Sequence, residues 1–397
     1  MLILMVAPQP FFRPRGTPFS VLHRIRALVR LGHEVDLVTY PFGDSPAIDG
    51  LRIIRTSRLP FVRDVPIGPS AAKLILDAPL FARVQRLAAR GDYDLLHTHE
   101  EAGVLGAWLA RRLGITHLYD MHSSLPQQFE NFGRFNWRPV IAAFRRLERY
   151  TLDGADGVIA VCPELRDHVD TSGYAGPVAL IENTLDFDPP ALTDSDVHAA
   201  RHRLGVGAGP AIVYTGTLEA YQGLELLIAA APAVVRAFPS ARFVVVGGTP
   251  DQIAGLAAQT RERGVDRAFV FVPAVAPTDV FLYQRLADAL VTTRSRGTNT
   301  PLKIYQYLRA GRPIVATRIR SHTQVLDDTS AELVSPSAEG VAEGLVRVLT
   351  DRGHAALLAD AAARLARERY SERTYLETLG ALLQQVVRAG AARRVAA

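Results

Sequence analysis

Cysteine and lysine are scarce in this chain, which holds one cysteine and two lysines among 397 residues. The single cysteine, Cys162, excludes a disulfide within the chain and suits a reducing compartment, where we expect it to be a small buried residue. Lysine occurs only at Lys73 and Lys303, so arginine carries most of the positive charge behind the net charge of +5. A net positive charge of this size permits contact with anionic lipids or polyanions and requires neither.

Long apolar runs, a secretory signal and nucleic-acid motifs are also missing. No segment approaches the roughly 20 apolar residues that span a bilayer. The apolar opening at residues 1–7 lacks the basic start and the cleavage site of a signal peptide, and it predicts a first buried strand. No stretch resembles a nucleic-acid-binding motif. We therefore expect a cytoplasmic protein that binds no nucleic acid and is either soluble or peripheral at the inner face of the membrane.

The length and composition predict two globular domains. A chain of 397 residues exceeds what one hydrophobic core usually supports. Its 48% hydrophobic and 21% charged residues suit large cores.

Strand-like and helix-like segments alternate through both halves of the chain. The first half has apolar periods that predict a helix over 21–31 and strands at 2–6, 35–39, 51–56, 95–97, 117–120, 157–161 and 178–181. The second half predicts a helix over 224–237 and strands at 211–214, 242–247, 268–271, 289–292, 313–316 and 331–334. This βαβ rhythm is typical of doubly wound parallel sheets. A connector over 186–205 joins the halves, and helices beyond residue 340 end in a frayed tail at 388–397.

The most informative stretch is a polar loop at 296–300 that runs into a helix. Thr300 is expected as the N-cap and Pro301 as the first helical residue, so free N–H groups and the positive helix end converge there. Lys303 lies in the first turn, where a cation opposes the helix dipole. A cation beside free amides indicates a site for a pyrophosphate. The alternative is an ordinary capped helix that packs between strands.

Residues 301–316 resemble the donor-binding signature of the retaining family-4 glycosyltransferases, in which a form P-x-K-x-x-E-Y-L-A-x-G-x-P-V-V occurs. The resemblance covers nearly the whole chain and implies the GT-B fold, an α/β architecture of two Rossmann-like, doubly wound parallel-sheet domains that face a cleft. It implies an acceptor-side domain over 1–187, a nucleotide-sugar-binding domain over 188–369, and a last segment over 370–397 that crosses back to the first domain.

The resemblance also assigns the donor-binding residues. Gly16 matches the second glycine of the family's Gly-Gly loop, where Arg15 replaces the first, and 272–275 match a loop that holds the nucleobase through main-chain groups. The expected donor-binding residues are Gly16, Gly216, Thr217, Gln222, Pro273, Val275, Arg294, Thr298, Asn299, Thr300 and Gln306. A turn glycine without a ligand is the alternative for Gly16, and a surface role is the alternative for Arg294.

Four positions depart from the family pattern by losing a charge. Gln306 and Thr298 replace the two glutamates of the usual E-x7-E pair, and a glutamine can still accept a ribose hydrogen bond without charge assistance. Thr217 and Gln222 replace the arginine and lysine that clamp the diphosphate. Arg294, Arg296 and Lys303 offer compensating charge nearby in the sequence.

Histidines follow two of the predicted strands. His97 and His99 have strand spacing, which puts both rings on one face, but we find no third ligand beside them and expect no metal. The resemblance places His99 near the donor sugar, whereas His97 is expected to be packed; a core role is the alternative for both. His122 and Ser123 match an acceptor-side loop, for which a simple turn is the alternative.

The acceptor is not readable from the motifs. An aromatic and basic segment could dock on a bilayer to reach a lipid-linked acceptor, and helix packing is the alternative; its residues are Phe129, Phe132, Arg134, Phe135, Trp137 and Arg138.

We therefore expect a retaining hexosyltransferase that moves a sugar from a nucleotide-diphospho-sugar to a glycan, lipid-linked or small-molecule acceptor. His99 and Lys303 are the expected catalytic residues, and neither a cofactor nor a metal is expected. One alternative is a GT-B subunit that binds a nucleotide or glycan without turnover, which the four lost charges favour. Another is a nucleotide-sugar epimerase, although its sugar-side carboxylates have no clear match here.

Overall fold

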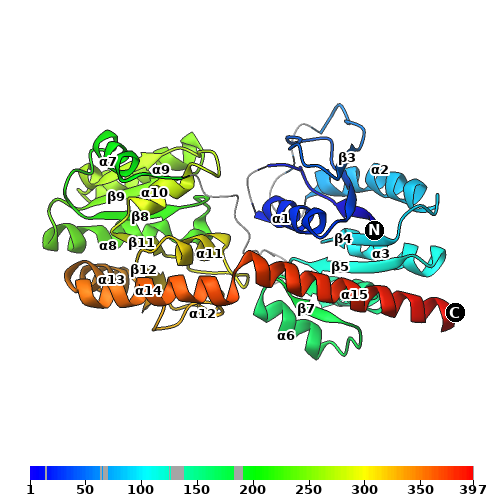
Figure 1. Cartoon of the computed structure of the whole chain (residues 1–397). Coiled ribbons are helices and arrows are strands. Elements are labelled where there is room, and N and C mark those ends of the chain that lie inside the picture. The colour runs from blue at the N-terminus through cyan, green and yellow to red at the C-terminus, as the bar shows by residue number, and fades with distance from the viewer. Residues whose placement is uncertain are drawn as a thin grey trace. The chain divides into compact units, whose positions relative to one another are not determined.

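The chain forms two compact units in the computed structural model (Figure 1). The first unit comprises Met1–Asn183 and Glu372–Ala397, and the second comprises Thr184–Ser371. The structure describes residues 1–13, 16–62, 65, 70–124, 126, 138–182 and 191–396. Arg15 and the aromatic segment over 129–137 lie outside the described residues.

The first unit is built on a parallel seven-stranded sheet with the order β3-β2-β1-β4-β5-β6-β7. Its strands are β1 (Leu2–Ala7), β2 (Glu34–Thr39), β3 (Leu51–Arg55), β4 (Leu95–His99), β5 (Thr116–Met121), β6 (Gly157–Ala160) and β7 (Val178–Leu180). β1 pairs with β2 on one side and with β4 on the other. The strand order therefore reverses at β1, and ligands of such sheets bind beyond the carboxyl ends of the strands at this point.

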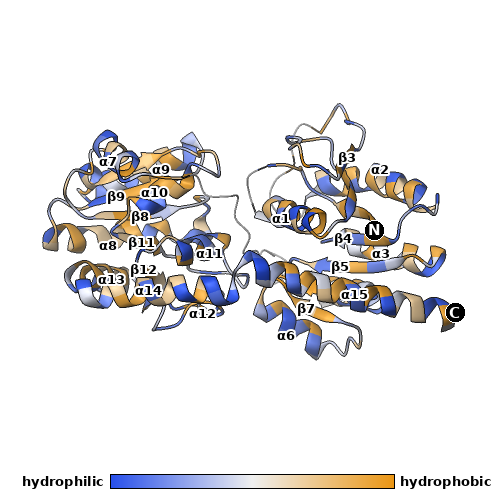
Figure 2. Ribbon diagram, in the orientation of Figure 1, coloured by the Kyte–Doolittle hydropathy of each residue, from blue (hydrophilic) through white to orange (hydrophobic). Residues whose placement is uncertain are grey.

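Helices cover this sheet. They are α1 (Gly16–Arg30), α2 (Ala71–Ala88), α3 (Ala102–Leu113), α5 (Arg138–Asp153), α6 (Pro163–Thr171) and α15 (Glu372–Ala396). The helices of both units carry apolar and polar residues in alternation (Figure 2), as expected of helices with one side on a sheet and the other in water. None of the described helices combines the length and the apolarity that crossing a bilayer requires.

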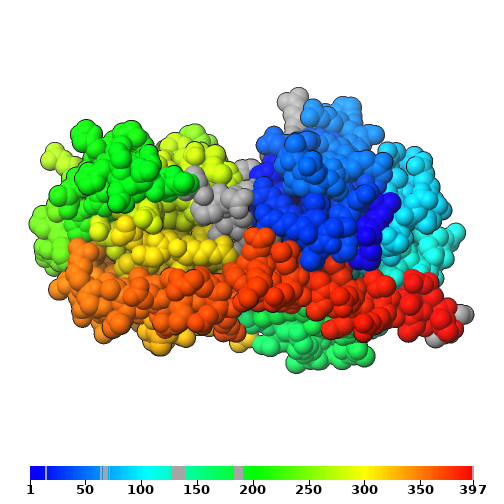
Figure 3. Space-filling view, viewed as in Figure 1, coloured from blue at the N-terminus to red at the C-terminus, as the bar shows by residue number. Residues whose placement is uncertain are grey.

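The last helix corrects the expectation of a frayed tail, because α15 continues to Ala396. Arg393 donates to both carboxylate oxygens of Asp156, at 2.8 and 2.9 Å, and to the carbonyl oxygens of Ala110 and Ile115. α15 contacts β5, β6 and β7 and forms a continuous ridge on the surface of the first unit (Figure 3). These long-range bonds fix a segment whose local sequence predicts fraying.

The second unit is built on a parallel six-stranded sheet with the order β10-β9-β8-β11-β12-β13. Its strands are β8 (Ala211–Thr215), β9 (Arg242–Val246), β10 (Phe269–Val272), β11 (Ala289–Thr292), β12 (Ile314–Thr317) and β13 (Glu332–Val334). Its α-helices are α7 (Asp194–Arg203), α8 (Leu224–Ala237), α9 (Pro250–Glu262), α10 (Val280–Arg285), α11 (Leu302–Arg309), α12 (Arg320–Thr323), α13 (Ala338–Thr350) and α14 (Arg352–Arg369).

α7 corrects the expected connector over 186–205. A capping box between Thr193 and Asp196 starts this helix. Ala200 is its only buried residue, so the helix has almost no apolar face by which its sequence could predict it.

Arg393→Ala is predicted to lower the melting temperature by roughly 5 °C, because the buried carboxylate of Asp156 loses its half-buried arginine partner. Arg388→Ala is the control, since Arg388 lies exposed on the same helix and should change the melting temperature little. Equal melting temperatures for the two variants would show that Arg393 does not fix the tail.

Candidate active site

The loops at the carboxyl ends of β8 and β9 are pressed together by glycine. The N–H of Gly216 donates to the carbonyl of Val246 at 3.0 Å. Gly216 and Gly247 have φ values of +136° and +128°, which side chains rarely adopt. A Cβ at Gly247 would lie 1.9 Å from the carbonyl oxygen of Gly216. These positions therefore require glycine, because other parts of the protein fill the space that a side chain would take.

The start of α11 corrects the predicted cap. Pro301 is the N-cap, with φ −63° and ψ 132°, and its carbonyl accepts the first helical bond from Ile304 at 3.0 Å. The helix begins one residue later than predicted, at Leu302, because Pro301 is extended. The hydroxyl of Thr300 is buried and makes no hydrogen bond within the described structure. Lys303 is in the first turn, as predicted.

Lys303 is buried among neutral groups. Its Nζ lies 3.6 Å from the centroid of the Tyr214 ring and donates to Oε1 of Gln222 at 3.3 Å. A Cβ on Gly216 would lie 3.0 Å from this nitrogen. Burial, followed by the charge of Arg294, lowers the pKa of Lys303 well below its usual value.

Arg294 is the second cation at this edge. Its Nη1 donates to the carbonyl of Asn299 at 2.7 Å, and its guanidinium lies 5.0 Å from the centroid of the Tyr221 ring. Within the described part of the chain, neither Arg294 nor Lys303 forms an ion pair with a carboxylate. Two partly or fully buried cations without a counter-anion are costly, so an anion would be bound here with a large electrostatic gain.

The neutral replacements Thr217 and Gln222 join the same group. Nε2 of Gln222 donates to the hydroxyl of Thr217 at 3.3 Å, while its Oε1 accepts from Lys303. The carbonyl of Thr217 accepts from the hydroxyl of Tyr214 at 2.7 Å. Gln222 therefore bridges the β8 loop to Lys303.

The remaining predicted donor residues follow neighbouring strands of the second unit. The carbonyl of Thr298 accepts from Gln324 at 2.6 Å. Oε1 of Gln306, on α11, accepts from Nε2 of Gln284 at 3.1 Å. Pro273 and Val275 follow β10, where Pro273 is exposed and Val275 is half-buried.

The first unit holds a buried polar cluster at the carboxyl ends of β4 and β5, with His97, His99 and Asp120 all at 0% exposure. His99 and Asp120 are register partners on the two strands. Nδ1 of His99 and Nε2 of His122 lie 2.9 Å apart. Asp120 Oδ2 lies 3.5 Å from Nε2 of His97 and 3.7 Å from Nδ1 of His99.

Asp120 corrects the expectation that no third group accompanies the histidine pair, because ligand atoms of His97, His99 and Asp120 lie within 4.8 Å of one another. Arg24, on α1, donates from Nε to Oδ2 of Asp120 at 2.9 Å and is fully buried. Its positive charge opposes a cation at this place. Burial alone would raise the pKa of Asp120, but Arg24 and His122 hold the pKa well below its usual range.

The carboxyl ends of β1 and β4 meet at a second polar group that the motifs did not single out. α1 starts at Gly16, and the hydroxyl of Thr17 donates to Glu100 at 2.9 Å. Glu100 has φ +51°, the only positive value among the described non-glycine residues. Lys73 pairs with both Glu100 and Glu101. The scarcity of lysine is the one sequence signal that could have pointed to Lys73.

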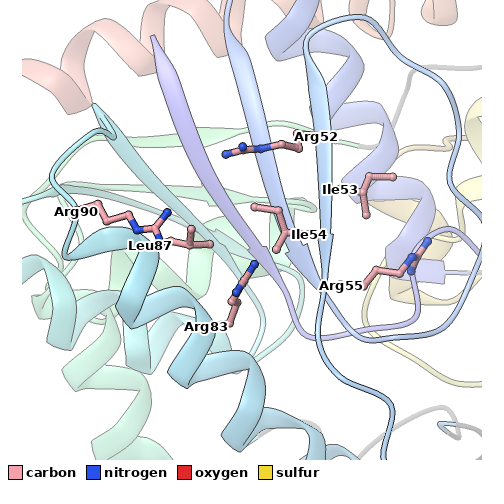
Figure 4. A pocket seen from close by; sticks show the side chains of 7 residues that line it. All are labelled: Arg52, Ile53, Ile54, Arg55, Arg83, Leu87 and Arg90. Carbon is pink, nitrogen blue, oxygen red and sulfur yellow. The ribbon is translucent and has the colours of Figure 1, made fainter.

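Arginines line a separate hollow of about 400 Å³ between β3 and α2 (Figure 4). Arg52 pairs with Asp36, and Arg55 donates to the carbonyls of Phe11 and Phe42. Two of the four arginines therefore stabilise the fold around the hollow, while Arg83 on α2 and Arg90 just beyond the end of α2 are exposed.

Two Rossmann-like parallel-sheet units in one chain are the architecture of the GT-B fold, which solved structures of glycosyltransferases share. The profile described as Glycosyltransferase Family 4 matches residues 14–188, and the profile described as Glycosyl transferases group 1 matches residues 209–351. The chain therefore belongs to the family-4, group-1 glycosyltransferases, which confirms the family, the fold and the enzyme class expected from its motifs.

Relatives and a solved structure cover most of the chain. The alpha-monoglucosyldiacylglycerol synthase of Streptococcus pneumoniae is 22% identical over 312 residues, which are 76% of this chain and 67% of that protein. The phosphatidyl-myo-inositol mannosyltransferase of Mycobacterium tuberculosis is 24% identical over 362 residues, 88% of each chain. The structure of Anabaena HepE in complex with UDP-glucose has a TM-score of 0.73 and 19% identity, and covers 97% of this chain and 99% of its own.

Acid is predicted to destabilise the protein below about pH 6.5. Burial lowers the pKa of His97, His99, His117 and His322, to about 4 for the last two. The unfolded chain binds protons at these histidines from about pH 6.5 downward, so stability is lost as the pH falls toward the folded values. The depressed pKa of Asp120 acts in the same direction below about pH 4. Melting temperatures that stay constant from about pH 7 to 5 would contradict this.

Proposed function

We propose that this protein is a retaining glycosyltransferase that uses a nucleoside-diphospho-sugar as donor and a lipid, inositol-type or glycan hydroxyl as acceptor. The observation that carries the proposal is the pair Lys303 and Arg294, which lie at the carboxyl edge of the second sheet with no carboxylate paired to them in the described part of the chain. A diphosphate is the part of such a donor that would complete this charge. The UDP-glucose complex of HepE, a protein of the same fold, supports this class of donor.

The diphosphate would be bound by charge and by backbone. Lys303 and Arg294 supply positive charge, and the first N–H groups of α11 and the amide of Gln222 supply further donors. Binding an anion would raise the pKa of Lys303 again and so favour the charged form of the lysine in the complex. No metal is then required for the leaving group.

The reaction breaks the bond between the anomeric carbon and the phosphate oxygen, and the acceptor oxygen forms the new bond on the same face. The acceptor proton goes to the leaving phosphate, so the protein needs no base of its own. Stabilisation of the negative charge that grows on the β-phosphate is the main task of the second unit, and it falls to Lys303. In the first unit, His99 would hydrogen-bond the transferred sugar, and His122 and Ser123 would contact the acceptor.

The activities for which the relatives are named support a lipid acceptor. One relative is a synthase of monoglucosyldiacylglycerol, and the other is a mannosyltransferase that acts on phosphatidyl-myo-inositol. For this chain we infer an amphiphilic acceptor and a place of action at the cytoplasmic face of a membrane.

A second candidate is a subunit that binds the nucleotide without turnover. It is favoured by the neutral Thr217 and Gln222 beside Lys303, where the family carries two cations. A donor-hydrolysis assay separates the two candidates, because a non-catalytic subunit would bind nucleoside diphosphates and release no sugar.

Lys303→Ala is predicted to reduce turnover by about 30- to 1,000-fold, which corresponds to roughly 2–4 kcal/mol of lost transition-state stabilisation. The melting temperature should stay equal or rise, because a buried cation without a partner is removed. Arg367→Ala is the control, since Arg367 is exposed on α14 and belongs to none of the predicted donor-binding positions. Turnover by Lys303→Ala within about twofold of the wild type would refute the diphosphate role.

Gln306→Glu is predicted to tighten donor binding, because a carboxylate gives a charge-assisted hydrogen bond to the ribose. The amide of Gln284 already donates to this side chain and can donate equally to a glutamate. Calorimetry with UDP, GDP and ADP should show the gain for the base that binds, and Gln259→Glu on the exposed side of α9 should show none. Unchanged or weaker affinity would mean that the site is built around glutamine.

A further inference from the structure

His99, the last residue of β4, and His122, which follows β5, form a chain of polar contacts that ends on an ion pair. His99 Nδ1 lies 2.9 Å from His122 Nε2, and this same nitrogen of His122 lies 3.4 Å from Oδ1 of Asp120. The other carboxylate oxygen of Asp120 accepts from Nε of Arg24 at 2.9 Å.

Only one of the two facing ring nitrogens can carry the hydrogen of their shared contact when both rings are neutral. Both nitrogens lie near the ionised carboxylate of Asp120, since Nε2 of His122 is 3.4 Å from Oδ1 and Nδ1 of His99 is 3.7 Å from Oδ2. Oδ2 is already bonded to Arg24, whereas Oδ1 makes no hydrogen bond among the described residues, so the carboxylate favours the hydrogen on Nε2 of His122. Nδ1 of His99 is then the acceptor. A neutral imidazole with an unprotonated Nδ1 carries its hydrogen on Nε2.

Nε2 of His99 is fully buried and has no hydrogen-bond partner among the described residues. Turning the ring would break the 2.9 Å contact of its Nδ1 with His122, and His97 stacks on the ring with centroids 4.7 Å apart. With the hydrogen on Nε2, His99 offers a hydrogen-bond donor. With the opposite tautomer it would offer an acceptor at the same place.

The ion pair that sets this choice is fixed from three elements. Arg24 lies on α1 and Asp120 on β5, and the ring of Tyr375 on α15 covers the guanidinium at 5.1 Å from its centroid. The side chains of Arg24 and Asp120 are 0% and 1% exposed, so solvent does not screen their attraction.

We propose that Asp120, held by Arg24, is a positioning residue that fixes His99 in the neutral tautomer with its hydrogen on Nε2, so that His99 donates a hydrogen bond to an oxygen of the sugar. The proposal rests on the proposed function for the identity of the sugar ligand, but the tautomer itself is a property of the free protein.

The test is nitrogen-15 NMR of the histidine rings in the full-length protein near pH 8, since ring-nitrogen shifts distinguish protonated from unprotonated positions. Spectra of His99→Gln and His122→Gln assign the signals. The expected result is a protonated Nε2 on both His99 and His122. A hydrogen on Nδ1 of His99 in the wild type overturns the proposal.

Asp120→Asn supplies the second arm, because an amide can donate to Nε2 of His122 and should drive both rings to the opposite tautomer. Turnover should then fall at least 100-fold while the KM for the donor stays within about threefold. Asp156→Asn is the matched control, since it also breaks a buried aspartate–arginine pair of the first unit and should leave the His99 tautomer and kcat unchanged.

An unchanged His99 tautomer in Asp120→Asn overturns the positioning role. If Asp120→Asn does not fold, the wild-type spectrum decides alone. The spectra need no substrate, so the two proposals fail separately. Absence of glycosyl transfer would refute the proposed function and would leave the assignment of the tautomer unchanged. A hydrogen on Nδ1 of His99 would refute the positioning role and would leave donor binding by the second unit unaffected.

Discussion

Burial of positive charge without a carboxylate partner is the constraint on which the proposed donor site depends. Lys303 lies over the ring of Tyr214 and against Gly216, and among the described residues the only side-chain oxygen that it binds is the amide oxygen of Gln222. Such an arrangement is unfavourable for folding, and natural proteins keep unfavourable arrangements mainly where they serve function. A diphosphate would supply the missing charge.

In the first unit, the buried positive charge has a carboxylate partner within the protein. The opposite charges of Arg24 and Asp120 neutralise each other in a fully buried ion pair, and the carboxylate of Asp120 also lies close to three histidine rings. The two units therefore have different roles in the proposed reaction. The second unit offers unpaired positive charge to the nucleotide, and the first unit orients the sugar through a network whose charges are paired.

Most of the fold could be predicted from the sequence, because buried strands of a parallel sheet are continuous apolar runs. The predicted strands and the helix over 224–237 lie within two residues of the observed elements. α7 escaped prediction because it buries only Ala200, and the tail was misjudged because Arg393 is fixed by Asp156, which is far away in the sequence.

The candidate site was predicted less completely. Glycines, Lys303 and His99 were visible because each stands at the end of a predicted strand or at the start of a helix. Asp120 was not recognised as a neighbour of His99, because that contact depends on the register of β4 with β5. Arg24 looks like any polar residue of an amphipathic helix. The cap at Thr300 was wrong because Pro301 itself takes that position.

Proton uptake on nucleotide binding tests the central claim most directly. Above about pH 8 the phosphates are fully ionised, so calorimetry in buffers of different ionisation enthalpy reports protons taken up by the protein alone. If the depressed pKa of Lys303 recovers beside a diphosphate, binding of the nucleoside diphosphate should take up a fraction of a proton in the wild type and none in Lys303→Ala. Equal proton uptake together with equal nucleotide affinity in both proteins would contradict a diphosphate on Lys303.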